Sequence, residues 1–408
     1  MIGEDRIRMS GDELRRVHVI RQAMDKTLTQ VEAGALVGVT ARQIRRLIQR
    51  VRQEGDRGLV HRGRGQPSNR RMAARRKAQM LRLYGQHYRD FGPTLAGEKL
   101  AERHGITLSD ETLRRWLREC GIAHFARRPR PHRAWRARKP HVGELVQLDG
   151  SHHDWLEGRG PRCVLMAYID DASSRVFARF YEYEGTRPAL DSFGRYVQQY
   201  GLPLAVYTDQ HTTYKSPGEP TVEAQLAGRP PQSQFERSLA ELGGAGLHAH
   251  SPQAKGRVER LFKTVQDRLV KELRLADIAT LEAANRFLEG YLLTYNQRFS
   301  VPPAQAADLH RPRPPRRDLA RSLCLKSTHV LRRDWTVVHH GHLYQVQPPV
   351  RATHVQVEER LDGTLRIMHQ GQPLRFHAIA ARPVKKTEGR TAALPRRTVT
   401  PKPAHPWR

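Results

Sequence analysis

An alternation of strand-like and helix-like segments between residues 144 and 275 constrains the fold more than any other feature of the sequence. Short apolar runs rich in β-branched and aromatic residues predict strands at residues 144–149, 163–169, 175–181 and 204–209. The full predicted order is strand, strand, strand, helix, strand, helix, strand, helix. The last helix has a buried stripe at helical spacing, formed by Val258, Leu261, Phe262, Val265 and Leu269.

Three carboxylates occupy particular places in this order. Asp149 closes the first predicted strand, Asp209 closes the fourth, and Glu259 lies on the last helix. A carboxylate at the end of a short apolar strand reaches solvent from a fixed backbone, which suits a metal ligand. On the helix, Lys255, Glu259 and Lys263 stand one turn apart in a single row. A solvated row of ion pairs is the alternative interpretation of that row.

Three words of the sequence contain these acids: QLDGSHHDW, VYTDQHTTYK and SPQAKGRVERLFKTVQDRLVKELR. In these words the chain resembles the ISNCY family of bacterial insertion sequences, whose members are DDE transposases with a retroviral-integrase-like, ribonuclease H-like core. The resemblance covers roughly residues 10 to 360. A proline-rich insertion from about Ser216 to Gln234 lengthens the segment between Asp209 and Glu259, and members of this family are expected to carry one.

The resemblance implies that Asp149, Asp209 and Glu259 are both catalytic residues and metal ligands. Two Mg²⁺ (or Mn²⁺) ions about 3.5–4 Å apart can activate the attacking oxygen and stabilise the leaving oxygen. Mg²⁺ prefers oxygen ligands, so carboxylates are the required residue types. Asp149 would bridge both ions, while the other two acids would each hold one. Water would cleave the element's ends, and the exposed 3′-OH groups would then attack target DNA. Lys255 and Lys263 would grip the phosphates of the ends.

Four other polar residues near these words are left out of the predicted catalytic set. His211 follows Asp209 closely, but a histidine in such a place is more often an ordinary loop residue. Asp154 does not lie at a predicted strand end. Asp170 and Asp171 lie in a predicted hairpin turn, which we expect at the far edge of the sheet from the metals.

The net charge of the chain indicates a polyanionic partner. It is +30, from 71 Lys and Arg against 41 Asp and Glu, and the excess is spread along the whole sequence. This excess of positive charge is too large for an ordinary cytosolic enzyme. Contact of several domains with DNA accounts for it better. No membrane partner is expected, because no apolar run reaches ~18 residues. The chain starts without a signal-peptide pattern, so we expect it in the bacterial cytoplasm, associated with the nucleoid.

Cysteine and histidine usage argues against a zinc module. The three cysteines, Cys120, Cys163 and Cys324, lie far apart, which excludes a disulfide framework and gives no zinc-finger spacing. Among the 21 histidines, the adjacent pairs His152–His153 and His339–His340 lack sequence spacing to a third ligand. The sequence therefore gives no pattern for a structural zinc finger.

Two helical modules precede the predicted core. Residues 10–60 are predicted to form a helix-turn-helix DNA-binding domain, in which the last of three helices enters the major groove with Arg42, Arg45 and Arg46 outward. Residues 73–122 are predicted to form a second helix-turn-helix module, with Arg114 and Arg115 outward. For each module the alternative is a small bundle with a solvated arginine face.

The remaining segments complete the domain organisation. Residues 61–72 resemble an AT-hook, in which Arg62 and Arg64 reach into a narrow minor groove; a flexible basic linker is the alternative. Residues 123–141 are predicted to be a basic linker along DNA. The catalytic core spans 142–310, an SH3-like β-barrel spans 320–381, and residues 382–408 are predicted to be a basic tail without order until DNA binds. Four barrel strands are predicted, at residues 328–333, 342–346, 354–358 and 365–369.

The predicted fold class is therefore multidomain, α plus α/β plus β. The predicted function is that of an insertion-sequence transposase that binds terminal inverted repeats and target DNA as a homo-oligomer. One alternative is a catalytically silent DNA-binding regulator derived from a transposase. A structure-selective nuclease such as a junction resolvase is a further alternative, although such an enzyme has little use for two helix-turn-helix modules.

Overall fold

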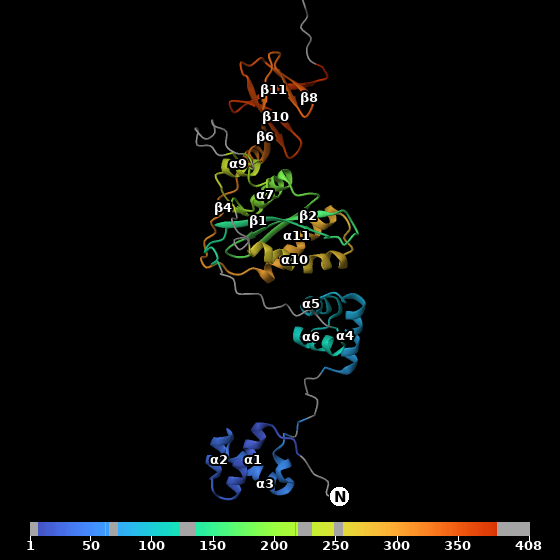
Figure 1. The fold of residues 1–408 in the computed structure, drawn as a ribbon, viewed down its shortest axis with the longest axis vertical. Helices are drawn as coiled ribbons and strands as arrows, with labels where there is room; N and C mark the ends of the chain where they lie inside the picture. Colours follow the sequence, from blue (N-terminus) through green and yellow to red (C-terminus); the bar gives the residue numbers. More distant parts are fainter. Residues whose placement is uncertain are drawn as a thin grey trace, which may run out of the picture. The chain divides into compact units, whose positions relative to one another are not determined.

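The computed structural model of the chain divides into two compact units, residues 1–126 and residues 127–408 (Figure 1). No helix in the part of the chain that it describes is long and apolar enough to cross a membrane. The described residues are 7–61, 63–64, 72–122, 136–216, 218, 231–248 and 256–381. Predictions for Arg62, Lys255, residues 123–135 of the 123–141 linker, most of the insertion and the C-terminal tail therefore lie outside them.

The first unit begins with the three helices predicted for a helix-turn-helix domain. They are α1 (Gly11–Met24), α2 (Gln30–Val37) and α3 (Ala41–Glu54), followed by the short η1 (Gly55–Leu59). Ser10 caps α1 and Thr29 caps α2, each in a capping box that satisfies otherwise unpaired backbone donors. The helices bury one shared core, to which Ile20, Ala33 and Ile44 contribute fully buried side chains.

The same unit contains a second group of three helices, α4 (Ala74–His87), α5 (Pro93–His104) and α6 (Asp110–Glu119). Tyr84 is fully buried, and its hydroxyl donates to the carbonyl of Phe91 at 3.0 Å. Leu113 and Leu117 on α6 are also buried, as the sequence pattern predicts. Their burial directs the charged residues of α6 to solvent.

The second unit contains a five-stranded mixed sheet of strand order β3-β2-β1-β4-β5. Strands β1, β2 and β3 pair antiparallel, whereas β4 pairs parallel with β1 and with β5. The predicted order of strands and helices and the ribonuclease H-like mixed sheet are confirmed. The elements are β1 (Leu145–His153), β2 (Cys163–Asp170), β3 (Val176–Tyr181), α7 (Thr186–Tyr200), β4 (Ala205–Thr208), α9 (Gln234–Glu241), β5 (Ala245–His248), α10 (Gly256–Leu275) and α11 (Leu281–Phe299).

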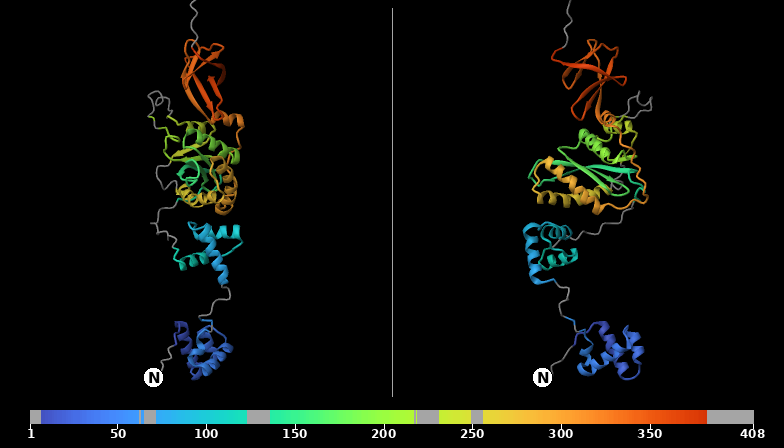
Figure 2. Two further views of the ribbon diagram at one scale, coloured as in Figure 1. Left: turned by 90° about the vertical axis from the view of Figure 1, so that its right-hand side faces the viewer. Right: turned by 180° about the vertical axis from the view of Figure 1, so that it is seen from behind.

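Helices cover both faces of this sheet, with α10 and α11 on one side and α7 on the other (Figures 1 and 2). Strand β2 is buried along its whole length, because its alternate side chains enter two different cores. Leu165, Ala167 and Ile169 pack with α10 and α11, whereas Val164, Met166 and Tyr168 pack with α7. All five residues of the stripe predicted for the last helix are buried on α10.

Strand β1 is longer than the sequence pattern predicts. It continues through His153, so Asp149 lies inside the strand rather than at its end. The polar residues after Asp149 resemble a turn in sequence, but β2 pairs with them as far as His153 opposite Cys163. The prediction that Asp154 does not lie at a strand end is also wrong, because Asp154 directly follows β1.

After the short helix α12 (Arg316–Ser322), the described part of the second unit ends in a curled, six-stranded antiparallel sheet (Figure 2). It has two strands more than predicted, the short β7 and β11. Its apolar core fits the small barrel that the sequence predicts. In the order β6-β9-β10-β11-β8-β7, the strands are β6 (Cys324–Val330), β9 (His354–Arg360), β10 (Leu365–His369), β11 (Gln372–Ile379), β8 (His342–Gln347) and β7 (Thr336–His339).

Candidate active site

Strands β1 and β4 bring the two aspartates to neighbouring positions. The strands are parallel and in register from Leu145 opposite Ala205 to Gln147 opposite Tyr207. Continuing this register by two residues places Asp149 beside Asp209, which directly follows β4. Neighbouring strands in a sheet are about 4.8 Å apart, so the two carboxylates can contact a common ion.

Helix α10 crosses the same face of β1. The backbone N–H of Val258 donates to Gln147 Oε1 at 3.3 Å, and Gln266 Nε2 donates to Ser151 Oγ at 3.0 Å. Gln147 and Ser151 flank Asp149 along the strand and share its face, because strand side chains alternate. Glu259 directly follows Val258 and is exposed in the first turn of α10. The fold therefore brings the helical segment that carries Glu259 alongside Asp149.

A buried polar network fixes the start of α10. Asp171 Oδ1 accepts from Arg257 Nε at 2.7 Å and from Gln147 Nε2 at 3.0 Å, and Arg136 pairs with the same oxygen. Asp171 and Gln147 are fully buried, and Arg257 is nearly so. Asp171 lies beside the start of β1, where its N–H donates to the carbonyl of Leu145 at 2.9 Å. Through Arg257 and Gln147 it connects the helix of Glu259 to the strand of Asp149.

Glu184, which no sequence pattern singled out, lies in the loop between β3 and α7. Its side chain is 11% exposed, and its carboxylate contacts His152 Nε2 at 2.9 Å and accepts from the Tyr214 hydroxyl at 3.4 Å. A Cβ atom at Gly150 would lie only 2.5 Å from this carboxylate. Glu184 thus packs behind β1, on the face opposite Asp149. The glycine after Asp149 is the sequence signal that could have indicated this close approach.

The Tyr214 hydroxyl lies in a negatively charged environment. Burial raises the pKa of the Tyr214 hydroxyl well above its ordinary value, and the nearby charges of Glu184, Asp149 and Asp209 raise it further. The N–H of His211 donates to Asp209 Oδ1 at 3.0 Å and so orients that carboxylate. The charges of Glu184, Asp149 and Asp209 therefore all disfavour ionisation of this hydroxyl.

The predicted DNA-contacting residues of the first module and of the AT-hook-like segment differ in their availability. Arg42, Arg45 and Arg46 are exposed on the outward face of α3. Arg64, by contrast, pairs with the buried Glu13 and donates to the carbonyl of Arg8. Hydrogen bonds from the backbones of Ser10 and His61 lower the pKa of Glu13 to about 2, so its charge is maintained. In this arrangement Arg64 ties the segment after η1 to α1.

Arg114, Arg115 and Lys263, which are also predicted to contact DNA, lie on exposed helix surfaces. On α6, Arg114 pairs with Glu111 at 2.5 Å and Arg115 lies 3.9 Å from Glu119. Exposed pairs of this kind contribute about 0–1 kcal/mol, so a DNA phosphate can replace the acidic partner at little cost. Lys263 is exposed on α10, one turn after Glu259.

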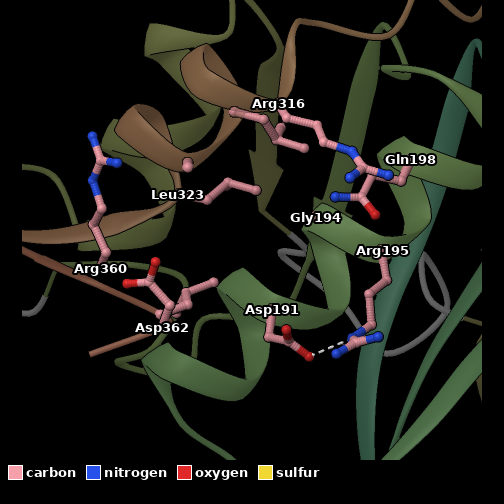
Figure 3. A pocket seen from close by; sticks show the side chains of 11 residues that line it. Asp191, Gly194, Arg195, Gln198, Arg316, Leu323, Arg360 and Asp362 are labelled. Atoms are coloured by element: carbon pink, nitrogen blue, oxygen red, sulfur yellow. Dashed lines mark hydrogen bonds and ion pairs between the residues drawn. The ribbon is translucent and has the colours of Figure 1, made fainter. Parts of the chain in front are cut away.

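A separate cavity of about 260 Å³ lies between α7, α12 and the β9–β10 turn (Figure 3). Arg195, Arg316 and Arg360 line it together with Asp191 and Asp362. Asp191 accepts a hydrogen bond from Arg195 Nε at 2.8 Å, as the dashed line in Figure 3 marks. The cavity is not lined by any of the three predicted catalytic carboxylates, so it is not part of the candidate active site.

Comparison with known proteins gives matches to DNA-binding and transposase sequences. Residues 15–68 match a family model described as a helix-turn-helix domain. The chain is 39% identical over 307 residues to y4bF of Sinorhizobium fredii, whose name assigns it to the transposases; the match covers 75% of this chain and 66% of that protein. It is 29% identical over 350 residues to the transposase for insertion sequence IS1202 of Streptococcus pneumoniae, covering 76% of this chain and 73% of that protein.

Among solved structures, the integrase catalytic core domain of HTLV-2 in complex with magnesium is 18% identical and covers 42% of this chain and 98% of that one, with a TM-score of 0.31. An intasome of simian T-cell lymphotropic virus in complex with a PP2A regulatory subunit is 16% identical, with a TM-score of 0.33. That match covers 74% of this chain and 100% of the other.

Proposed function

The chain is a homologue of bacterial insertion-sequence transposases, and on that premise we propose that it cleaves the ends of a DNA element and joins their 3′-OH groups to target DNA. The observation that carries the proposal is the placement of Asp149, Asp209 and the Glu259 segment around one part of the sheet. The chemistry is of the DDE type, and these three carboxylates are its catalytic residues.

The donor set fits Mg²⁺ or Mn²⁺, because all three residues offer hard carboxylate oxygens. Asp149 would hold both of two ions, and Asp209 and Glu259 would hold one each; the ions supply activation of the attacking oxygen and stabilisation of the leaving oxygen. The protein keeps these ligands in place by the register of β1 and β4 and by the Asp171–Arg257 contact at the start of α10.

Recognition of the element's ends is assigned to the N-terminal unit. Arg42, Arg45 and Arg46 on α3 would reach base edges and phosphates in the major groove, and the arginines of α6 would contact the backbone. Lys263, and Lys255 outside the described residues, would hold the phosphates next to Glu259. A homo-oligomer on DNA, acting in the cytoplasm, would bring two ends together.

The test is a reaction of the purified chain with Mg²⁺ and linear DNA that carries the sequences flanking its own gene. Strand breaks are mapped at nucleotide resolution, and a plasmid serves as target. The proposal predicts breaks that leave 3′-OH groups at the element's two ends, followed by joining to the plasmid. Specific binding to these ends without any break or joining, in Mg²⁺ and in Mn²⁺, would instead indicate a DNA-binding regulator.

A further inference from the structure

Three metal-ligating side chains meet in the C-terminal sheet, away from the three predicted catalytic carboxylates. They are His339 at the end of β7, His340 in the β7–β8 turn and Glu359 on β9. Glu359 Oε2 lies 3.9 Å from His339 Nε2 and 3.5 Å from His340 Nε2. One ligand atom from each residue lies within 4.8 Å of the other two.

These separations are too long for good hydrogen bonds but suit ligands of one ion. An N–H···O hydrogen bond has a donor–acceptor distance of about 2.7–3.2 Å. Two ligand atoms about 2.0–2.1 Å from a tetrahedral Zn²⁺ lie roughly 3.3 Å from each other. A small contraction of the cluster would therefore bring all three ligands to a shared ion.

The buried Nε2 atom of His339 is an independent observation that points to a bound ion. His339 is only 8% exposed, and its Nε2 has no hydrogen-bond partner among the described residues. Leaving such an atom unpaired costs free energy, so it calls for a partner that the described residues do not supply. Its other ring nitrogen, Nδ1, contacts His329 Nε2 at 3.2 Å, which fixes the ring orientation.

The remaining contacts prepare the other two ligands. Arg187, in the first turn of α7, pairs with Glu359 Oε1 and leaves Oε2 to face the histidines. The His340 side chain is 71% exposed, which gives an ion access from solvent.

We propose that His339, His340 and Glu359 bind one divalent transition-metal ion, for which Zn²⁺ is the best match to two imidazoles and a carboxylate. Water would complete the coordination. Sequence spacing predicts no third donor for His339 and His340, and this prediction is wrong. The third donor is Glu359, which lies on a strand that is distant in sequence. Through Arg187 the ion would strengthen the connection between the C-terminal sheet and the helix that covers the catalytic sheet.

The experiment titrates Co²⁺, a spectroscopic substitute for Zn²⁺, into the full chain in the presence of excess Mg²⁺, which occupies the carboxylate site. The proposal predicts one Co²⁺ per chain with the visible absorption of a low-symmetry nitrogen–oxygen site. Competition by Zn²⁺ should abolish that absorption. His340→Asn suits the positive φ of 47° at this position, and it should weaken binding at least tenfold.

The matched control is His342→Asn, which changes an exposed histidine of β8 that is not a member of the cluster. It should bind Co²⁺ like the parent chain. His339→Asn is the second test variant, and circular dichroism establishes that each variant is folded. Absence of Co²⁺ binding by the folded parent chain, or equal affinity in parent and folded His340→Asn, would overturn the proposal.

Discussion

Glu259→Gln is expected to lower the rates of end cleavage and joining by about a thousandfold or more, as for residues that act as one catalytic unit. The amide keeps the size of the side chain but loses the charge that holds a divalent ion. Binding of the element's ends should be unchanged, because it is assigned to residues 14–140. The measurement is single-turnover cleavage in Mg²⁺, with DNA affinity determined in parallel at the same salt concentration.

Asp267→Asn is the matched control for this substitution. Asp267 lies two turns further along α10, is exposed, and pairs with Lys271 at 2.5 Å. Its amide variant should cleave like the parent chain. If Glu259→Gln cleaves and joins at the parent rate instead, the assignment of Glu259 is wrong and Asp267 becomes the next acid to consider on this helix.

Substitutions of the other carboxylates test the same assignment. Asp149→Asn and Asp209→Asn should lose activity as Glu259→Gln does, and double variants should lose little more than single ones. Glu184→Gln should lose much less, because Glu184 supports β1 from the opposite face and its amide oxygen can still accept hydrogen bonds. Equal losses for Glu184→Gln and Glu259→Gln would contradict this division of roles.

Asp171→Asn is expected to destabilise the second unit by about 3–5 kcal/mol, the usual cost of removing one partner from a buried ion pair. Asp171 is fully buried, and the substitution would leave the guanidinium of Arg257 buried at the start of α10 without its carboxylate. That loss is a large fraction of the stability of a typical domain, about 5–15 kcal/mol. Urea denaturation of the full chain, followed by tryptophan fluorescence, measures it.

Asp267→Asn again provides the comparison, since it removes an exposed carboxylate from an aspartate–lysine pair on the same helix. Its effect on the free energy of unfolding should be about 0–1 kcal/mol. If the two aspartate-to-asparagine variants are equally stable, Asp171 does not hold α10 as described.

Much of the core fold could be predicted from the sequence because its signals are local. The apolar stripe of α10 recurs at helical spacing, and all of its residues are buried. The end of β1 could not be predicted in this way, because the polar residues after Asp149 extend only by pairing with the apolar β2. Of the extra strands of the C-terminal sheet, β7 is only four residues long, whereas β11 carries an alternation of Leu374, Phe376 and Ala378 that could have indicated a strand.

Only part of the candidate site could likewise be predicted from the sequence. Asp149, Asp209 and Glu259 could be chosen from motif and element order. Glu184 could not, because its contact with Gly150 depends on how the loop before α7 folds back on β1. Asp171 was predicted to be a turn residue, and its burial with Arg257 depends on the packing of α10. The His339–Glu359 cluster likewise joins side chains whose spacing in sequence carries no signal.

Electron paramagnetic resonance of Mn²⁺ bound to the chain on its terminal DNA tests the carboxylate site most directly. The experiment uses His340→Asn as the background, so that an ion at the His339–Glu359 cluster is not counted. Two ions about 3.5–4 Å apart are magnetically coupled. We predict a coupled Mn²⁺ pair in this background and its loss on Asp149→Asn or Glu259→Gln. A coupled pair that persists in Asp149→Asn, or a chain that binds only isolated Mn²⁺, would contradict the assignment of Asp149, Asp209 and Glu259 to one two-metal site.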